Sequence, residues 1–148
     1  MITPVTYEEI TNISDELGQS FFDEAELPGS FKLEAFKHNW QGLIKNNIGA
    51  MWKLMVGGKF AGAIGGVFFP DVNSGEMVAS EMFWYVHPDY RNTKWSIRLF
   101  RTFEQWAKTM GAKRVFMTYL LSSMPESLKR FYEHQGYKPV EVNYMKDL

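Results

Sequence analysis

The sequence predicts an α+β fold of three layers, in which helices flank a mostly antiparallel sheet. Gly57 and Gly58 separate two apolar runs, and such a pair is a hairpin signal because both glycines tolerate positive φ. After Thr93, apolar side chains recur every three to four positions, which is the period of a helix. The elements follow the order β, α, α, β, β, β, α, β, α, β, which alternates too irregularly for an all-parallel sheet.

The N-terminal part predicts a short strand and two helices. The strand covers Ile2–Val5, and Thr6 or a neighbour caps a helix that runs to about Leu17. The Pro28-Gly29 pair breaks the chain. A second helix covers about Ser30–Asn46, and the near-helical spacing of its apolar residues predicts that one face lies on the sheet.

The central part predicts three consecutive strands. Met51–Val56 and Lys59–Phe69 meet at the glycine hairpin, Asp71–Gly75 forms the next turn, and Glu76–Val86 is the third strand. Strands joined by such short turns are antiparallel neighbours.

The next segment predicts a helix and a strand. The helix begins near Thr93, with Asn92 or Thr93 as its cap, and Gly111 is suited to end it because glycine adopts the left-handed conformation of a helix stop. We then expect a buried strand over Arg114–Leu120.

The last segment predicts one more helix and a closing strand. Ser123 and Glu126 have the spacing of a capping box, with a proline in the tolerated first turn. The helix runs to about Gln135 and ends at Gly136, and Val140–Tyr144 closes the sheet.

Length and composition limit the classes of function. A chain of 148 residues that is 45% hydrophobic predicts one domain spanning residues 1–148. Its net charge of −1 gives no bulk attraction to nucleic acid or to an anionic membrane. The apolar run Ala61–Phe69 is far shorter than the roughly 20 residues of a membrane helix, and the N-terminus has no secretory pattern. We therefore expect a cytoplasmic protein without nucleic-acid or membrane partners.

The cysteine and histidine content excludes further mechanisms. The chain has no cysteine, so it has no disulfide, no thiolate metal site and no cysteinyl acyl-enzyme. His38, His87 and His134 lack the spacing of metal ligands, and we expect no metal. The context of His87 and His134 predicts surface positions for both.

Two motifs carry a resemblance to a known family. Residues 86–96 read Val-His-Pro-Asp-Tyr-Arg-Asn-Thr-Lys-Trp-Ser, which resembles V-x-P-x-Y-[RQ]-x-x-G-x-[GA], the acetyl-CoA signature of the GNAT superfamily of N-acetyltransferases. Residues 131–137, Phe-Tyr-Glu-His-Gln-Gly-Tyr, resemble its [LF]-Y-E-x-x-G-[FY] motif. Lys94 and Ser96 depart from the pattern, because they stand where glycine and glycine or alanine let the backbone approach the phosphates.

The resemblance implies a GNAT fold, with a mixed, mostly antiparallel twisted sheet, and acetyl-CoA as the acetyl donor. Its pantetheine and thioester would lie along the third strand, where a bulge separates that strand from the next, and its phosphates at the following helix start. The cofactor-binding residues implied are Phe83, Trp84, Tyr85, Val86, Arg91, Asn92, Thr93, Lys94, Trp95, Ser96 and Arg98. The alternative for Arg91, Lys94 and Arg98 is a solvated basic helix start, although cations are disfavoured there without an anion. Aromatic residues of that helix, including Trp95, Phe100 and Phe103, are expected to pack in the core.

Two residues are candidates for catalysis. Tyr132 lies in the second motif, and the resemblance implies that it returns a proton to the leaving thiolate; the alternative is a ring packed in the core. Glu81 is the candidate base, because strand alternation places it on one face with Phe83 and Tyr85, and desolvation by such aromatic rings raises a carboxyl pKa. The alternatives for Glu81 are a solvated strand-edge carboxylate, one paired with Lys or Arg, or a water relay in its place.

The resulting hypothesis is an acetyl-CoA-dependent N-acetyltransferase that acts through a ternary complex. The acceptor is an amine of unknown identity, either a small molecule or a protein lysine attracted by the acidic segment from Glu8 to Glu26. A GNAT-shaped pseudoenzyme, a CoA-binding or protein-interaction module, is the alternative that Lys94 and Ser96 leave open. Small members of similar appearance are encoded by bacteriophages, which would place the protein in a host cytoplasm. The oligomeric state stays open between monomer and homodimer.

Overall fold

The computed structural model describes residues 1–148, which form two compact units, Met1–Thr118 and Tyr119–Leu148. The first unit contains the sheet and three α-helices, and the second contains one α-helix. No helix is both long enough and apolar enough to cross a membrane.

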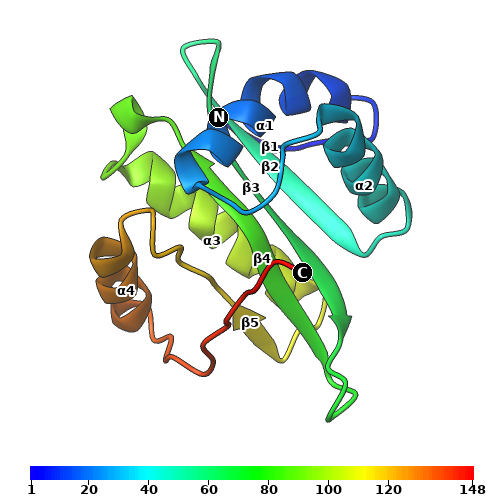
Figure 1. The fold of residues 1–148 in the computed structure, drawn as a ribbon, viewed down its shortest axis with the longest axis vertical. Coiled ribbons are helices and arrows are strands. Elements are labelled where there is room, and N and C mark those ends of the chain that lie inside the picture. Colours follow the sequence, from blue (N-terminus) through cyan, green and yellow to red (C-terminus); the bar gives the residue numbers. More distant parts are fainter. The chain divides into compact units, whose positions relative to one another are not determined.

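A five-stranded sheet is the centre of the first unit (Figure 1). Its strands lie side by side in chain order, and the first four are antiparallel, whereas the last pairs in parallel with its neighbour. The strands are β1 (Ile2–Pro4), β2 (Gly49–Val56), β3 (Lys59–Pro70), β4 (Met77–Val86) and β5 (Arg114–Phe116). The prediction of a mixed, mostly antiparallel sheet is confirmed.

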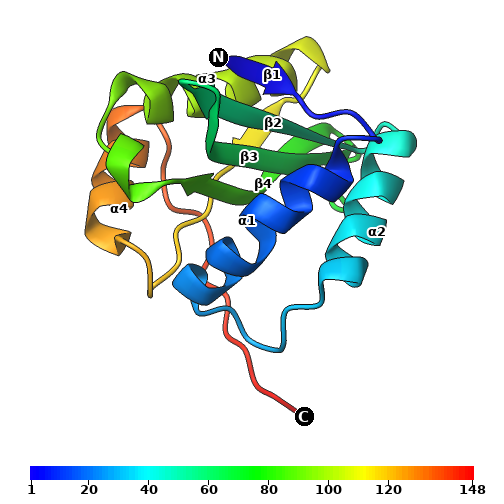
Figure 2. The same ribbon diagram turned by 90° about the horizontal axis from the view of Figure 1, so that it is seen from above.

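Helices cover both faces of this sheet, which gives the three predicted layers (Figure 2). Helices α1 (Ile10–Ala25) and α2 (Leu33–Lys45) lie on one face, and α3 (Lys94–Thr109) lies on the other. Each face has its own apolar cluster, the first around Phe83 and Trp40 and the second around Leu99 and Phe103. Because both faces are buried, the inner strands lack the polar alternation of a half-exposed sheet.

Helix α1 is longer than predicted. It continues past Leu17 to Ala25, and Glu26 ends it in the left-handed conformation at φ 49°. Gly18 interrupts the apolar pattern in the sequence, yet it has a packing role: a Cβ there would stand 2.3 Å from the ring of Phe31. The ring of Phe31 therefore explains why a glycine stands at this position of the helix.

The predicted turns around β3 and α3 are confirmed. Gly57 and Gly58 have φ values of 57° and 77°, as a two-residue hairpin requires. Thr93 caps α3, since its Oγ1 accepts the N–H of Trp95 at 3.2 Å, and Gly111 follows the helix at φ 89°. Phe100 and Phe103 are fully buried, and Trp95 is half-buried against the second cluster.

Strand β5 is shorter than the predicted Arg114–Leu120. Only Arg114–Phe116 pair with β4, and these residues are exposed or half-buried rather than fully buried. The pairing ends because β4 bulges after Glu81, and the main-chain N–H of Thr118, two residues beyond the strand, donates to the Glu81 carboxylate instead.

In the second unit, helix α4 (Pro125–His134) starts one residue later than predicted. The carbonyl of Met124 accepts the first helical N–H, from Leu128, and no side chain caps the helix, so the Ser123 capping box is wrong. Gly136 follows the helix at φ 89°.

The closing strand at Val140–Tyr144 is also wrong, because residues 137–148 contain no strand. The alternating valines and tyrosine of this segment are exposed. The second unit has no other strand with which the segment can pair.

Candidate functional site

A bulge in β4 separates the part of the strand that pairs with β5 from the part that does not. Gly65 of β3 lies opposite Phe83, and Gly66 lies opposite Glu81, so Met82 is the extra residue. Pairing between β4 and β5 ends at Ser80. Strand pairing between β4 and β5 therefore covers only Val78–Ser80, and the segment from Glu81 to Val86 lies beyond it, as the resemblance implied.

The backbone of this segment has a defined orientation. The N–H of His87 donates to the carbonyl of Ala61 on β3 at 2.8 Å. Since successive backbone groups of a strand alternate sides, the N–H groups of Trp84 and Val86 point to the opposite edge. The side chains of Phe83 and Tyr85 are buried in the α1 and α2 cluster, and their main chain pairs with Gly65 and Ala63 of β3, so the structure leaves neither residue directed at the open edge of β4.

Glu81 is a buried carboxyl group at the bulge, with 7% of the residue exposed. Its Oε2 accepts the main-chain N–H of Thr118 at 3.1 Å. Burial raises the pKa of Glu81 to about 7, although the hydrogen bond from Thr118 lowers it. A carboxyl group with such a pKa exchanges protons near neutral pH, which is the property of a general base.

The surroundings of Glu81 differ from the prediction. Paired residues share a face of the sheet, and a Cβ built on Gly66, the partner of Glu81, would strike the ring of Phe103 on α3. A Cβ built on Gly65 would strike Phe83 and Trp40 on the opposite face. The bulge thus inverts the alternation, and Glu81 does not share a face with Phe83 and Tyr85.

The loop after β4 turns sharply into α3. A 3-10 turn (Pro88–Tyr90) follows the strand, and Asn92 adopts the left-handed conformation at φ 57°. Thr93 Oγ1 donates to the carbonyl of Tyr90 at 2.6 Å, and Ser96 Oγ donates to the carbonyl of Thr93 at 2.8 Å. In this first helical turn, the N–H groups of Lys94 and Ser96 have no acceptor within the helix. Such N–H groups can donate hydrogen bonds to an anion.

Two cations flank an aromatic ring at this helix start. Lys94 Nζ lies 5.6 Å and Arg98 Cζ lies 5.3 Å from the centre of the Trp95 ring. Lys94 and Arg98 are exposed, and neither forms an ion pair. The structure therefore brings both charges to the helix start without a carboxylate to neutralise them.

Arg91 has a different environment from Lys94 and Arg98. Its Nε donates to the carbonyl of Val86 at 2.7 Å, and its Nη2 lies 2.5 Å from Oε1 of Glu24 in the last turn of α1. Its guanidinium also lies 6.0 Å from the centre of the Tyr85 ring. Burial, and secondarily the charge of Glu24, raises the pKa of Tyr85, which keeps this phenol neutral.

Tyr132 lies on α4 in the second unit and is buried. Its ring contacts Phe131 and Tyr137, with ring centres 5.9 Å apart in each case. These contacts agree with the packing role, and the catalytic role of Tyr132 stays a prediction.

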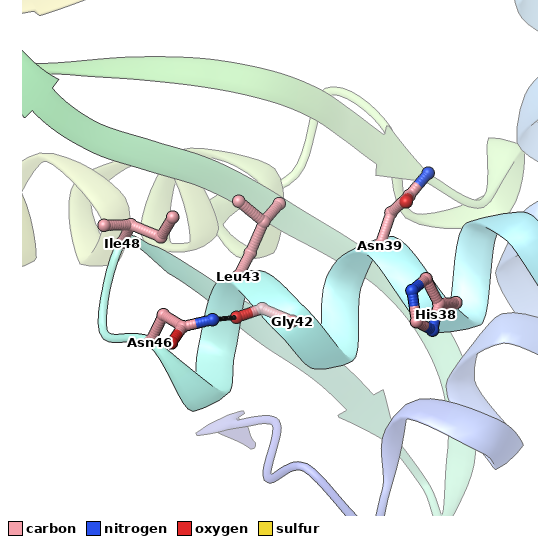
Figure 3. A pocket seen from close by; sticks show the side chains of 6 residues that line it. All are labelled: His38, Asn39, Gly42, Leu43, Asn46 and Ile48. Carbon is pink, nitrogen blue, oxygen red and sulfur yellow. Dashed lines mark hydrogen bonds between the residues drawn. The ribbon is translucent and has the colours of Figure 1, made fainter.

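The remaining candidates of the sequence lie elsewhere. His87 and His134 are exposed, as predicted, and no cluster of side chains suited to a metal is present. A hollow of about 420 Å³ beside α2 and the turn that follows it shares no residue with the site (Figure 3). Its lining residues are His38, Asn39, Gly42, Leu43, Asn46 and Ile48.

Sequence patterns missed Glu24 and Thr118. Glu24 stands in an acidic helix without any motif, and only the ion pair with Arg91 distinguishes it. Thr118 contributes a main-chain N–H, which leaves no signal in a side-chain pattern.

The main-chain edge of β4 and the basic start of α3 fit the parts of acetyl-CoA, whose amide-bearing arm requires backbone partners and whose phosphates require N–H groups and cations. A mixed sheet with this divergence, followed by this helix, defines an α+β protein of the acetyltransferase class. The model of the acetyltransferase (GNAT) family matches residues 10–137, and the chain belongs to this family.

Solved structures show the same fold at low sequence identity. A predicted acetyltransferase from Clostridium acetobutylicum, crystallised with acetyl-CoA, has a TM-score of 0.79 and 12% identity, covering 99% of this chain and 95% of its own. An aminoglycoside acetyltransferase from an uncultured soil sample, in complex with trehalose, has a TM-score of 0.75 and 13% identity. This match covers 100% of this chain and 95% of that protein. Ribosomal-protein-alanine N-acetyltransferase from Brucella melitensis has a TM-score of 0.71 and 14% identity. This match covers 100% of this chain and 99% of that protein. No curated protein sequence matches the chain.

Proposed function

We propose that this protein is an acetyl-CoA-dependent N-acetyltransferase that transfers an acetyl group directly to an amine in a ternary complex. The observation that carries the proposal is the diverging β4, which ends beside two unpaired cations at the start of α3. Membership of the acetyltransferase family supports acetyl-CoA as the donor.

In this proposal, acetyl-CoA supplies the acetyl thioester. The β4 edge at Val86, whose N–H points away from β3, binds the pantetheine arm, and the first turn of α3 with Lys94 and Arg98 binds the phosphates. Glu81 accepts a proton from the attacking amine, and Tyr132 donates a proton to the thiolate that leaves. The new bond joins the amine nitrogen to the acetyl carbon as the carbon–sulfur bond breaks.

The acceptor in this proposal carries positive charge. Residues 1–31, which include α1, contain seven acidic side chains and no lysine, arginine or histidine. Several of these acids, including Glu8, Glu16 and Asp23, are exposed and form no ion pair. An aminoglycoside and a ribosomal-protein amine, the acceptors in the names of two structural neighbours, have this chemistry. A cytoplasmic location and a bacteriophage origin stay predictions, as do the single domain and a homodimer.

A pseudoenzyme that only binds CoA or a protein is the second candidate. Lys94 and Ser96 favour it, because their side chains occupy positions where the family signature has glycine or alanine. The two candidates differ in thiol release: the enzyme liberates CoA from acetyl-CoA when an amine is present, whereas the pseudoenzyme does not.

Ligand binding and thiol release test the proposal together. A ligand at about 100 times its Kd adds roughly 2.7 kcal/mol to stability, which raises the Tm of a domain of this size by several degrees. We expect this shift with acetyl-CoA, CoA in the mass spectrum of the purified protein, and thiol release with polyamine or aminoglycoside acceptors. No Tm shift at millimolar acetyl-CoA, with desulfo-CoA equally inert, would refute the enzyme.

A further inference from the structure

Two donor atoms of Arg91 contact the protein itself. Its Nε donates to the carbonyl of Val86, the last residue of β4, and its Nη2 contacts Glu24 in the last turn of α1. A guanidinium group has a rigid fork of donors, so these two contacts fix its plane. The signature arginine therefore bridges the strand end and the helix end rather than pointing freely to solvent.

The position of Glu24 at the end of α1 favours a cationic partner. Glu24 and Asp23 stand at the C-terminal end of α1, where the helix dipole disfavours carboxylates, and no basic residue occupies that turn. Asp23 is hydrogen-bonded within its own helix by Gln19, whereas Glu24 is paired across space with Arg91. About a third of the Glu24 side chain and a fifth of the Arg91 side chain are exposed, so the pair is partly desolvated.

The bridge joins the two halves of the proposed site. Arg91 begins the loop that leads to Lys94 and the start of α3, on the donor side. Helix α1 carries the acidic residues proposed for the acceptor side. No other ion pair of the first unit joins α1 to this loop.

We propose that Glu24 is a positioning residue that holds Arg91 against the end of β4 and thereby couples the last turn of α1 to the cofactor loop. Arg91 then acts as a structural bridge, and the phosphates are bound by Lys94, Arg98 and the helix start. Cofactor binding orders the acceptor-side helix through this pair. The part of the inference that concerns CoA rests on the proposed function.

The direction of one affinity change distinguishes this role from phosphate binding by Arg91. Glu24→Gln keeps the size of the side chain and removes its charge, so the bridge weakens and we expect CoA to bind about threefold to tenfold more weakly. If Arg91 binds phosphate instead, the loss of a competing carboxylate releases it and CoA binds more tightly. Asp23→Asn, an adjacent acid outside the bridge, is the matched control, and its Kd should stay within about twofold of the wild type. Isothermal titration with CoA measures all three proteins.

Hydrogen exchange tests the coupling itself. In the wild type, CoA should slow exchange at residues 21–25 and at residues 84–97. In Glu24→Gln, the slowing at residues 84–97 should persist while that at residues 21–25 is lost, a separation that general destabilisation does not produce. Tighter CoA binding by Glu24→Gln, or full transmission to residues 21–25 in that variant, overturns the proposal.

The free protein separates this inference from the proposed function. If CoA does not bind the wild type, the proposed function fails. Hydrogen exchange in the ligand-free protein then tests whether Arg91 and Glu24 form the bridge. Arg91→Gln should then speed exchange at residues 21–25 by about threefold or more, because Glu24 is left unpaired at the helix end. Unchanged exchange in that variant overturns the bridge, whatever the outcome with CoA.

Discussion

The carboxylate of Glu81 accepts the main-chain N–H of Thr118 at 3.1 Å, at the point where β4 and β5 cease to pair. In a regular sheet, a carbonyl of the neighbouring strand would accept this N–H. Here the bulge at Met82 removes that carbonyl, and a side chain replaces it. One buried acid therefore completes the sheet edge and is also available for proton transfer.

The first prediction concerns stability against pH. Burial raises the folded-state pKa of Glu81 from 4.5 to about 7, so between these values the folded state binds more protons than the unfolded state. The contribution of Glu81 is complete below about pH 4.5 and is lost as the pH rises to about 7. Glu81→Gln removes this loss, so its stability relative to the wild type should grow by about 3 kcal/mol from pH 4.5 to 8.

Urea unfolding at a series of pH values measures this difference. Glu76→Gln is a suitable control, because Glu76 is the exposed residue before β4 and pairs with Arg114 at the surface. Because Glu76→Gln keeps the Glu81 carboxyl group, its stability should fall between pH 4.5 and 8 as that of the wild type does. Parallel curves for Glu81→Gln as well would mean that Glu81 titrates like an ordinary exposed glutamate.

The second prediction concerns catalysis by Glu81. A base must be deprotonated to accept the amine proton, so activity should rise with pH through an apparent pKa near 7. Glu81→Gln should lower kcat by about 100-fold or more, with part of the rate recovered at high pH, where the amine deprotonates unaided. A pH–rate series of both proteins measures this. A deficit that is equal at every pH would assign Glu81 a structural role.

The sequence predicted the burial of Glu81 but not its neighbours. The apolar residues around it indicated desolvation, which the structure confirms. Strict alternation then placed Glu81 with Phe83 and Tyr85, and this is wrong because one inserted residue, Met82, changes the face. A bulge depends on pairing with β3, which lies outside the local pattern of β4 itself.

Other differences have the same origin in long-range contacts. The hairpin at Gly57 and Gly58 was predicted correctly, and Thr93 was one of the two predicted caps of α3, since each of these residues acts on its own turn. The pairing of Arg91 with Glu24 could not be predicted, because 67 positions separate the two residues and no motif contains both of them. Val140–Tyr144 has the alternation of a strand, yet alternation forms a strand only where a neighbouring edge accepts it.

The third prediction concerns Tyr132. Tyr132→Phe removes only the phenol oxygen, so CoA affinity should stay nearly unchanged while turnover falls by about 10- to 1,000-fold. Titration calorimetry and steady-state kinetics measure the two quantities separately. Tyr137→Phe, which removes the hydroxyl of the neighbouring ring and leaves the hydroxyl of Tyr132 in place, is the matched control. Equal turnover in Tyr132→Phe, with the chemical step shown to be rate-limiting, would remove the acid role.

The last prediction concerns Lys94, where this chain departs from the family signature. Its ammonium group lies beside the Trp95 ring at the start of α3, is exposed and has no carboxylate partner. If it replaces the close backbone approach that glycine allows, Lys94→Ala should weaken CoA binding by about 1.5 to 3 kcal/mol, the usual size for a hydrogen bond to a charged group.

Dephospho-CoA identifies the phosphate that Lys94 contacts. If Lys94→Ala costs as much with this analogue as with CoA, the contact is with the pyrophosphate; a smaller cost assigns it to the ribose phosphate. Arg101→Ala serves as the cation control, because Arg101 is an exposed cation further along α3, and this change should alter affinity little. Tighter binding by Lys94→Gly would instead identify the lysine as an obstruction, and it would favour the pseudoenzyme.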